Sequence, residues 1–123
     1  MLTNGVDIIE ISRIREIIER WGNRFLDRIY TDIELTICKG RPDKLASRFA
    51  GKEAVMKALG TGARGISWRE IEIASEASGK PVVNLYGKAQ EKAESLGLSE
   101  LAISLSDSRE YSVAFVIGEM KFD

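Results

Sequence analysis

Three charged residues with potential chemistry lie close together on one predicted helix. The sequence from residue 48 to residue 62 reads Arg-Phe-Ala-Gly-Lys-Glu-Ala-Val-Met-Lys-Ala-Leu-Gly-Thr-Gly. At about 100° per residue, Lys52 falls within roughly 20° of the helix's apolar stripe, and Glu53 and Lys57 flank that stripe one turn apart. Charges on a packed face need partners, because water cannot solvate them there. Two interpretations follow: a Glu–Lys pair whose aliphatic stems cover the core, or an anion and metal site.

A further carboxylate, Asp7, lies in the middle of an apolar predicted strand with the sequence Gly-Val-Asp-Ile-Ile. An unpaired buried Asp is costly, so it needs either hydrogen bonds or a cation, and both remain open here. If this strand packs against the helix, Asp7 and Glu53 could together hold one Mg²⁺. This ion usually takes one or two carboxylates together with waters and phosphate oxygens.

The composition restricts the chemistry, since the chain has no histidine and one cysteine. These counts argue against a zinc site and favour a hard, oxygen-binding metal. Any general base should be a carboxylate, a lysine or a metal-bound water. Cys38 cannot form an internal disulfide, which fits the cytosol, and we expect it to serve in packing.

The 123 residues predict one soluble domain, residues 1–123, with 44% hydrophobic and 30% charged residues. The sequence contains neither an apolar run of membrane-spanning length nor a signal peptide, so we expect a cytoplasmic protein without membrane contact. A net charge of −1 and a short basic stripe without interleaved aromatic residues argue against nucleic-acid binding.

The order of elements predicts an α+β fold, with helices packed on a mainly antiparallel β-sheet. Thr31 and Glu34 form a capping box, and Pro42 and Gly60 bound the long helix that carries Lys52. A strand around Ile71–Ile73 should be half-buried, because its isoleucines alternate with glutamates. The predicted helices are 11–25 (with a break at Gly22), 31–39, 42–59 and 88–95, and the strands are 3–9, 70–73, 81–86, 101–105 and 111–118.

The loop after the long helix matches G-x-G-x-x-G, the dinucleotide-binding fingerprint, from Gly60 to Gly65. That motif functions between a strand and the helix that follows it, whereas here it follows a helix and leads towards a strand. We therefore reject a Rossmann site. The loop either cradles a phosphate with its backbone N–H groups or is simply a helix C-cap with a turn.

Taken in order, these segments resemble the holo-acyl-carrier-protein synthases, the small phosphopantetheinyl transferases of fatty acid synthesis. The matching segments are Gly5-Val-Asp-Ile8 with Glu10 and Arg13-Ile14, Phe49 to Gly62, Ile71-Glu-Ile73, Gly79-Lys-Pro81 and Ser104 to Tyr111. The resemblance implies the 4′-phosphopantetheinyl transferase fold. It also implies transfer of 4′-phosphopantetheine from coenzyme A to a serine of apo acyl carrier protein, with release of adenosine 3′,5′-bisphosphate.

The resemblance also implies residue roles. Asp7 and Glu53 would hold Mg²⁺ with the pyrophosphate of coenzyme A, and Lys57 would lie beside the phosphate that leaves. The serine proton would pass to Glu53, Asp7 or a metal-bound water, of which we favour the water or Glu53. The candidates for binding coenzyme A are Arg48, Lys52 (which could instead pair structurally), Lys57, Gly60, Thr61, Gly62 and Ser106.

One residue departs from the family pattern. Family members usually carry a histidine after S-[IVL]-[ST], whereas this chain has Asp107 there. An acid facing a cofactor phosphate would repel it. Asp107 therefore turns away, or binds a cation or a ribose hydroxyl, or the contact is lost.

The first helix offers a surface for a partner. Its basic residues would ordinarily form a solvated face, but acyl carrier proteins are acidic, and arginine binds carboxylates in bidentate fashion. We expect this face to dock the carrier through Arg13, Ile17, Arg20, Trp21 and Arg24. The resemblance further implies a homotrimer with active sites between subunits. The apolar side of residues 101–105 could be either core or interface.

Two rival functions stay open. One is a non-catalytic module that binds coenzyme A or a carrier protein, against which the presence of Asp7, Glu53 and Lys57 argues. The other is a transferase for the carriers of polyketide or peptide synthases. Enzymes of the larger type look like two fused copies of this fold, so the length of this chain argues against them.

Overall fold

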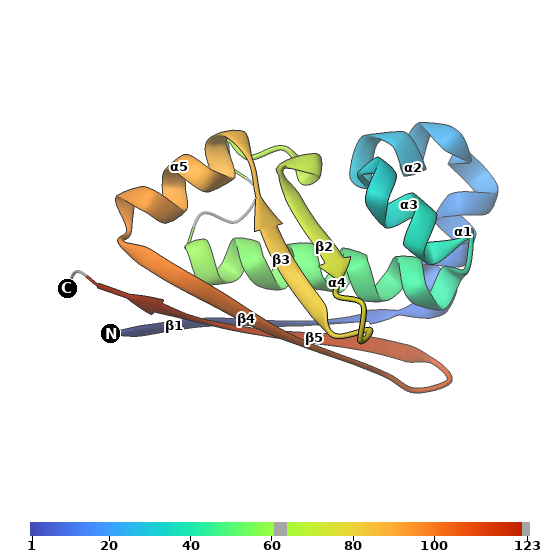
Figure 1. Ribbon diagram of the computed structural model, residues 1–123. Coiled ribbons are helices and arrows are strands. Elements are labelled where there is room, and N and C mark those ends of the chain that lie inside the picture. The colour runs from blue at the N-terminus through green and yellow to red at the C-terminus, as the bar shows by residue number, and fades with distance from the viewer. Residues whose placement is uncertain (61–63, 122–123) are drawn as a thin grey trace.

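A computed structural model describes residues 1–60 and 64–121 and shows an α+β arrangement (Figure 1). The helices and strands, in chain order, are β1 (Leu2–Glu10), α1 (Ile11–Trp21), α2 (Asn23–Ile29), α3 (Asp32–Cys38), α4 (Pro42–Leu59), the short 3₁₀ helix η1 (Trp68–Glu70), β2 (Ile71–Ser75), β3 (Pro81–Leu85), α5 (Gly87–Ser95), β4 (Leu98–Asp107) and β5 (Tyr111–Met120). In this part of the chain, none of the helices has both the length and the apolar character needed to cross a membrane.

The strands form two antiparallel sheets. The larger sheet has the order β1-β5-β4, and β2 pairs with β3 in the smaller one. Helix α4 runs along one face of the larger sheet, with α1, α2 and α3 gathered at one end of the molecule and α5 at the other (Figure 1). The predicted fold class is therefore confirmed, with the strands divided between two sheets.

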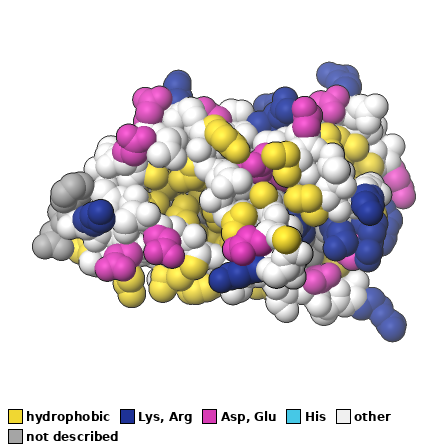
Figure 2. Space-filling model, viewed as in Figure 1, with side chains coloured by type: hydrophobic (Ala, Val, Ile, Leu, Met, Phe, Trp, Pro, Cys, Tyr) yellow, Lys and Arg dark blue, Asp and Glu magenta, His cyan; other side chains and the backbone are white. Residues whose placement is uncertain are grey.

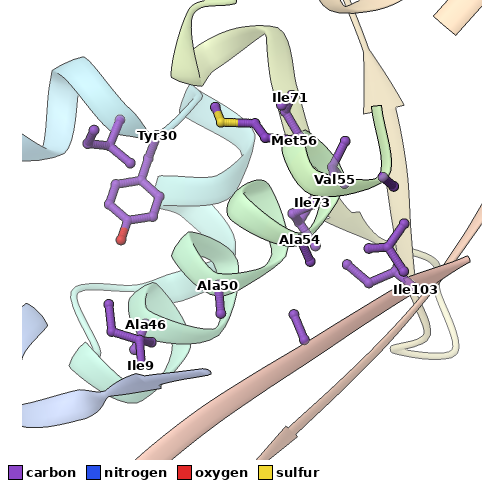
Figure 3. Close-up of a cluster of buried hydrophobic side chains, with 14 of the residues drawn as sticks. Ile9, Tyr30, Ala46, Ala50, Ala54, Val55, Met56, Ile71, Ile73 and Ile103 are labelled. Carbon is purple, nitrogen blue, oxygen red and sulfur yellow. The ribbon is translucent and has the colours of Figure 1, made fainter. Parts of the chain in front are cut away.

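Helix α4 has the predicted bounds because local residues set both of its ends. Pro42 occupies the first helical position, where its missing N–H costs nothing, and Gly60 adopts the left-handed conformation (φ 76°) that ends the helix. Its buried face carries alanines at every fourth position: Ala46, Ala50, Ala54 and Ala58. Figure 3 shows the first three of them along α4, with Ile9 of β1 beside Ala46.

These small side chains bring α4 unusually close to β1. A Cβ added to Gly5 would lie 2.0 Å from the carbonyl oxygen of Ala54, so only glycine fits there. One turn further along the helix, the hydroxyl of Thr3 donates to the carbonyl oxygen of Ala58 at 2.7 Å. The close approach places Asp7, on the same face of β1, against the helix that carries Glu53 and Lys57.

Two local predictions about the helices are confirmed. Gly22, with φ 54°, separates α1 from α2 at the predicted break. Thr31 and Glu34 form both hydrogen bonds of the capping box at the start of α3. Both features depend on residues close together in sequence, and for that reason sequence patterns could identify them.

The prediction of a half-buried strand around Ile71–Ile73 is wrong, because β2 is buried on both faces. Glu72 is 3% exposed. Its carboxylate accepts hydrogen bonds from Thr31, Asn84 and Tyr86. Burial alone would raise the pKa of Glu72. These hydrogen bonds outweigh burial and lower the pKa below its ordinary value. Partners from distant segments therefore allow a charged residue to lie on a buried strand face.

Candidate active site

Asp7 and Lys57 meet where β1 crosses α4. Asp7 lies on the face of β1 that is turned towards the helix, and its side chain is 13% exposed. The Nζ atom of Lys57 lies 3.2 Å from Oδ1 of Asp7 and donates to the carbonyl oxygen of Val6 at 2.8 Å. The side chain of Lys57 is 54% exposed, so a ligand's phosphate can still reach its ammonium.

Glu53 completes the candidate site one helical turn before Lys57. Burial and the neighbouring carboxylate of Asp7 raise the pKa of Glu53, while Lys57 and Arg13 act in the opposite direction. Two carboxylates placed side by side repel each other, and a bound cation relieves that repulsion. The structure thus brings together the three predicted residues Asp7, Glu53 and Lys57.

The site offers two carboxylates, which suits Mg²⁺ and is too few for a metal whose ligands all come from protein. Within residues 1–60 and 64–121, no group of three or more His, Cys, Asp or Glu side chains could hold a metal ion. Two carboxylates are what Mg²⁺ commonly takes from a protein, with waters and phosphate oxygens as its remaining ligands. The predicted metal ligands, Asp7 and Glu53, are consistent with that pattern.

Lys52 forms a buried ion pair rather than facing the candidate site. Its side chain is 0% exposed, and its Nζ atom lies 2.7 Å from Oε1 of Glu34, a side chain that is equally buried. Burial lowers the pKa of Lys52, and the carboxylate of Glu34 opposes that shift. The geometry therefore favours the structural pairing that the sequence left open, and we exclude Lys52 from the residues expected to bind coenzyme A.

Arg48 lies at a separate cavity of about 320 Å³. Its guanidinium, in a residue that is 7% exposed, donates to Oγ of Ser75 at 3.0 Å, to Oγ of Ser47 at 3.3 Å and to the carbonyl oxygen of Ile73 at 3.4 Å. The other residues that line this cavity are Ile37, Asp43, Lys44, Gly79, Pro81, Leu105 and Asp107.

Sequence reasoning missed most of this cavity. The spacing of Lys44 and Arg48, one turn apart on α4, was a usable signal, because such residues share a helix face. Ser75 comes from another element and carried no such signal. Asp107 lines the cavity, whereas Ser106, the next residue back along β4, is exposed and is not among the lining residues. The structure therefore does not bring Ser106 to Arg48.

The predicted glycine loop is described only in part. Gly60 forms the left-handed C-cap of α4, and its N–H donates to carbonyl oxygens of that helix. Thr61 and Gly62 lie outside the described residues. Binding of coenzyme A by these three residues stays a prediction.

The predicted docking face lies on α1 and α2. Arg13, Arg20 and Arg24 are exposed, Ile17 is half-buried, and Trp21 is 48% exposed. The guanidinium carbons of Arg20 and Arg24 lie 5.5 and 5.9 Å from the centre of the Trp21 ring. Figure 2 shows Lys and Arg side chains gathered at this end of the molecule. The ring therefore holds together two arginines that the break at Gly22 would otherwise allow to diverge.

Cys38 shows no sign of a chemical role. It is fully buried. Burial is the main reason that the pKa of its thiol rises to about 11. A thiol in such surroundings is a poor nucleophile, which agrees with the packing role expected from the sequence.

Comparisons with known proteins identify the family of this chain. A sequence model of the 4′-phosphopantetheinyl transferase superfamily matches residues 4–116. A holo-[acyl-carrier-protein] synthase of Dehalococcoides mccartyi is 50% identical, over 97% of this chain and 99% of the relative. One from Herpetosiphon aurantiacus is 46% identical, over 96% of this chain and 98% of the relative.

Solved structures show the same similarity. The holo-[acyl-carrier-protein] synthase of Neisseria meningitidis has a TM-score of 0.85 and 42% identity, with 95% of this chain and 97% of that chain covered. The Helicobacter pylori enzyme, solved in complex with coenzyme A, has a TM-score of 0.87 and 30% identity, with 94% and 99% covered. The match thus extends over almost the full length in both sequence and fold, and the chain belongs to the 4′-phosphopantetheinyl transferase superfamily, among its holo-acyl-carrier-protein synthases.

Proposed function

We propose that this enzyme transfers 4′-phosphopantetheine from coenzyme A to a serine of apo acyl carrier protein and thereby serves fatty acid synthesis in the cytoplasm. The observation that carries this function is the convergence of Asp7 from β1 with Glu53 and Lys57 from α4. Coenzyme A as the donor is supported by the Helicobacter pylori relative, whose structure contains it.

Asp7 and Glu53 would hold a Mg²⁺ ion, for which their adjacent carboxylates are suited. When bound, Mg²⁺ neutralises charge on the pyrophosphate of coenzyme A. Lys57 adds a second positive charge on the solvent side of the same site, because just over half of its side chain is exposed. Displacement at phosphorus depends mainly on positioning and on neutralisation of charge, and these residues contribute to both.

In the reaction, the serine oxygen of the carrier bonds to the phosphorus that bears pantetheine. The bond from that phosphorus to the bridging oxygen breaks, and adenosine 3′,5′-bisphosphate leaves with the electron pair. Lys57 stabilises the negative charge that develops on this leaving group. We propose Glu53 as the acceptor of the serine proton, because the chain has no histidine to serve as a base and Glu53 is a carboxylate of this site.

The cavity beside Arg48 is our candidate for a second region that binds coenzyme A. Lys44 and Arg48 bring positive charge to it, and Ser47 and Ser75 bring hydroxyl groups, which together suit an anionic ligand. Asp43 and Asp107 lie on the same cavity and reduce its positive potential. We therefore expect weaker binding of phosphate groups there than a histidine at position 107 would provide.

The arginine face of α1 and α2 is our candidate surface for the carrier protein. It combines exposed guanidinium groups with the partly exposed ring of Trp21. Arginines and aromatic residues of this kind are common at the centre of protein interfaces. An acidic carrier protein would complement the charge of this surface.

We further propose that three copies of the chain associate through the outer face of the larger sheet. Val6 and Ile8 of β1 are 53% and 62% exposed there, and Phe115 and Ile117 of β5 are 43% and 36% exposed. A contiguous apolar sheet face of this kind is unfavourable in water and suits an interface. The sequence allowed the apolar side of residues 101–105 to be either core or interface. Ile103 lies in the core, with Leu101 and Leu105 packed against it, so this side is core.

The function is tested by incubating an apo acyl carrier protein with the enzyme, coenzyme A and Mg²⁺ and then measuring the intact mass of the carrier. A mass gain of one phosphopantetheine group, absent when EDTA is added, is the expected result. No gain with a fatty acid carrier or with polyketide and peptide synthase carriers, despite binding of coenzyme A, would contradict it. That outcome would favour a non-catalytic binding module. A gain only with synthase carriers would assign the enzyme to those systems instead.

A further inference from the structure

A buried charge network lies on the side of α4 that faces α3 and β2. Its centre is the ion pair between Lys52 and Glu34, both fully buried and 2.7 Å apart at Nζ and Oε1. Glu72 joins through Thr31, whose hydroxyl donates to Oε2 of Glu72 at 2.7 Å. We refer to Thr31, Glu34, Lys52 and Glu72 as the buried charge network.

The polar groups at the centre of the network are fully used. The ammonium of Lys52 donates to Glu34 and to the carbonyl oxygens of Trp68 (3.1 Å) and Ile71, which gives three acceptors for three protons. Glu34 also accepts from the backbone N–H groups of Thr31 at 2.9 Å and Ile73 at 2.7 Å. The network therefore joins α3, α4 and β2 through bonds of fixed direction.

Stability alone is a weak reason for such a network. A buried ion pair loses so much hydration that a well-packed apolar pair of similar size is often at least as stable. What the ion pair adds is direction, because its hydrogen bonds are satisfied in only one arrangement of the three elements.

On the opposite side of α4, the hydrogen bonds to β1 lie near the C-terminal end of the helix, where Thr3 donates to the carbonyl oxygen of Ala58 and Lys57 donates to that of Val6. On this side, the helix meets β1 through its alanine row, with Ala54 against Gly5. Small side chains allow close approach but form only shallow ridges, so they resist rotation of the helix weakly. Lys52 precedes Ala54 by two residues, which places it about 160° away around the helix. The network thus holds α4 from the side opposite to β1.

Glu53 lies between these two contacts, next to Lys52 in the chain. On the basis of the metal-binding role proposed above for Asp7 and Glu53, we propose that the Lys52–Glu34 pair fixes the rotation of α4 and so positions Glu53 against Asp7. A rotation of about 20° would move a carboxylate about 6 Å from the helix axis by about 2 Å. Displacements of about 1 Å can reduce catalysis roughly 100-fold.

The test uses the full-length double variant Lys52→Met/Glu34→Gln, which removes both charges and keeps side chains of similar size. Mn²⁺ binding, measured by electron paramagnetic resonance, reports on Asp7 and Glu53 independently of turnover. We expect the variant to unfold cooperatively with native-like circular dichroism, but to bind Mn²⁺ about tenfold or more weakly. We also expect kcat to fall about tenfold or more while KM for the carrier stays within about twofold.

The controls separate positioning from general loss of stability. Ile29→Val alters a buried residue of α2 outside the network and should leave Mn²⁺ affinity unchanged. A Mn²⁺ affinity and kcat within twofold of wild type in the folded double variant, or equal losses in Ile29→Val, would overturn the positioning role. If the double variant fails to fold, Glu34→Gln alone decides: weaker Mn²⁺ binding supports the role, and unchanged binding refutes it. Failure of the wild type to bind Mn²⁺ would instead contradict the proposed metal site.

Discussion

At the scale of single residues, the chemistry depends on two carboxylates that share one site. Glu53 is half-buried, and its environment raises its pKa above the ordinary value of 4.5 because of burial and the charge of Asp7. A residue with this property binds a proton more tightly in the folded than in the unfolded chain. Its stabilising contribution is therefore complete below pH 4.5 and is lost as pH rises through its folded-state pKa.

This linkage predicts how Mg²⁺ and pH act together. Mg²⁺ needs the ionised carboxylates, so the increase in Tm that it causes should be small near pH 5 and should grow towards about pH 7.5. Thermal unfolding with and without Mg²⁺ across this range measures the effect, and Glu53→Gln should abolish most of it. An increase that is independent of pH, or one that persists in Glu53→Gln, would mean that the ion binds elsewhere.

Sequence patterns could predict the residues of the site but not all of their partners. Helical spacing singled out Glu53 and Lys57, and an apolar strand singled out Asp7, but both patterns also allowed structural roles, and the family resemblance decided for a site. The role of Lys52 could not be decided in this way, because its partner Glu34 lies on another helix. The same limit applies to Ser75, which meets Arg48 only after β2 packs beside α4.

At the scale of elements, the contact between β1 and α4 sets how closely Asp7 approaches the helix that carries Glu53. Gly5→Ala would force a methyl group against the carbonyl oxygen of Ala54, only 2.0 Å from its ideal position. We expect a loss of at least about 3 kcal/mol in the free energy of unfolding, because backbone must move to relieve the clash. We also expect a large loss of activity, because Asp7 shifts with its strand.

Chemical denaturation measures the change in stability, and Glu91→Ala is the control, since Glu91 is exposed on α5, away from β1 and from the proposed interface. A Gly5→Ala enzyme with wild-type stability and activity would show that the close approach is not required.

The arginine face belongs to the same scale, because α1 and α2 present it together. Arg20→Glu reverses a charge beside Trp21 and should raise KM for the carrier about tenfold or more, with KM for coenzyme A within about twofold. Lys88→Glu, an exposed charge reversal on α5 at the other end of the molecule, serves as the control. Steady-state kinetics with each substrate varied separately gives both values. Equal effects on the two KM values would contradict a docking role.

The bounds of the elements were predictable where caps and turns are local. Pro42, Gly60 and the capping box of α3 set helix ends from within a few residues, so those ends agree with the structure. The burial of β2 was not predictable in the same way. The alternating pattern predicts that Glu72 faces solvent. In the structure, Asn84 and Tyr86, from a later segment of the chain, donate hydrogen bonds to its buried carboxylate.

At the scale of the whole molecule, the exposed face of the larger sheet predicts self-association. Phe115→Glu would place a charge at the centre of this apolar face and should convert a trimer into monomers. Sedimentation equilibrium measures the assembly, with the conservative Phe115→Leu as the control. A wild-type enzyme that is a stable, fully active monomer would contradict the proposed assembly.

The central claim is that Asp7, Glu53 and Lys57 together carry out the transfer of phosphopantetheine. The most direct test is a time course of carrier mass with wild-type enzyme and Glu53→Gln, under saturating coenzyme A and Mg²⁺. We expect complete conversion by wild type and a rate at least about 100-fold lower for Glu53→Gln, with the circular dichroism of the variant unchanged. A folded Glu53→Gln enzyme that modifies the carrier as fast as wild type would contradict the account.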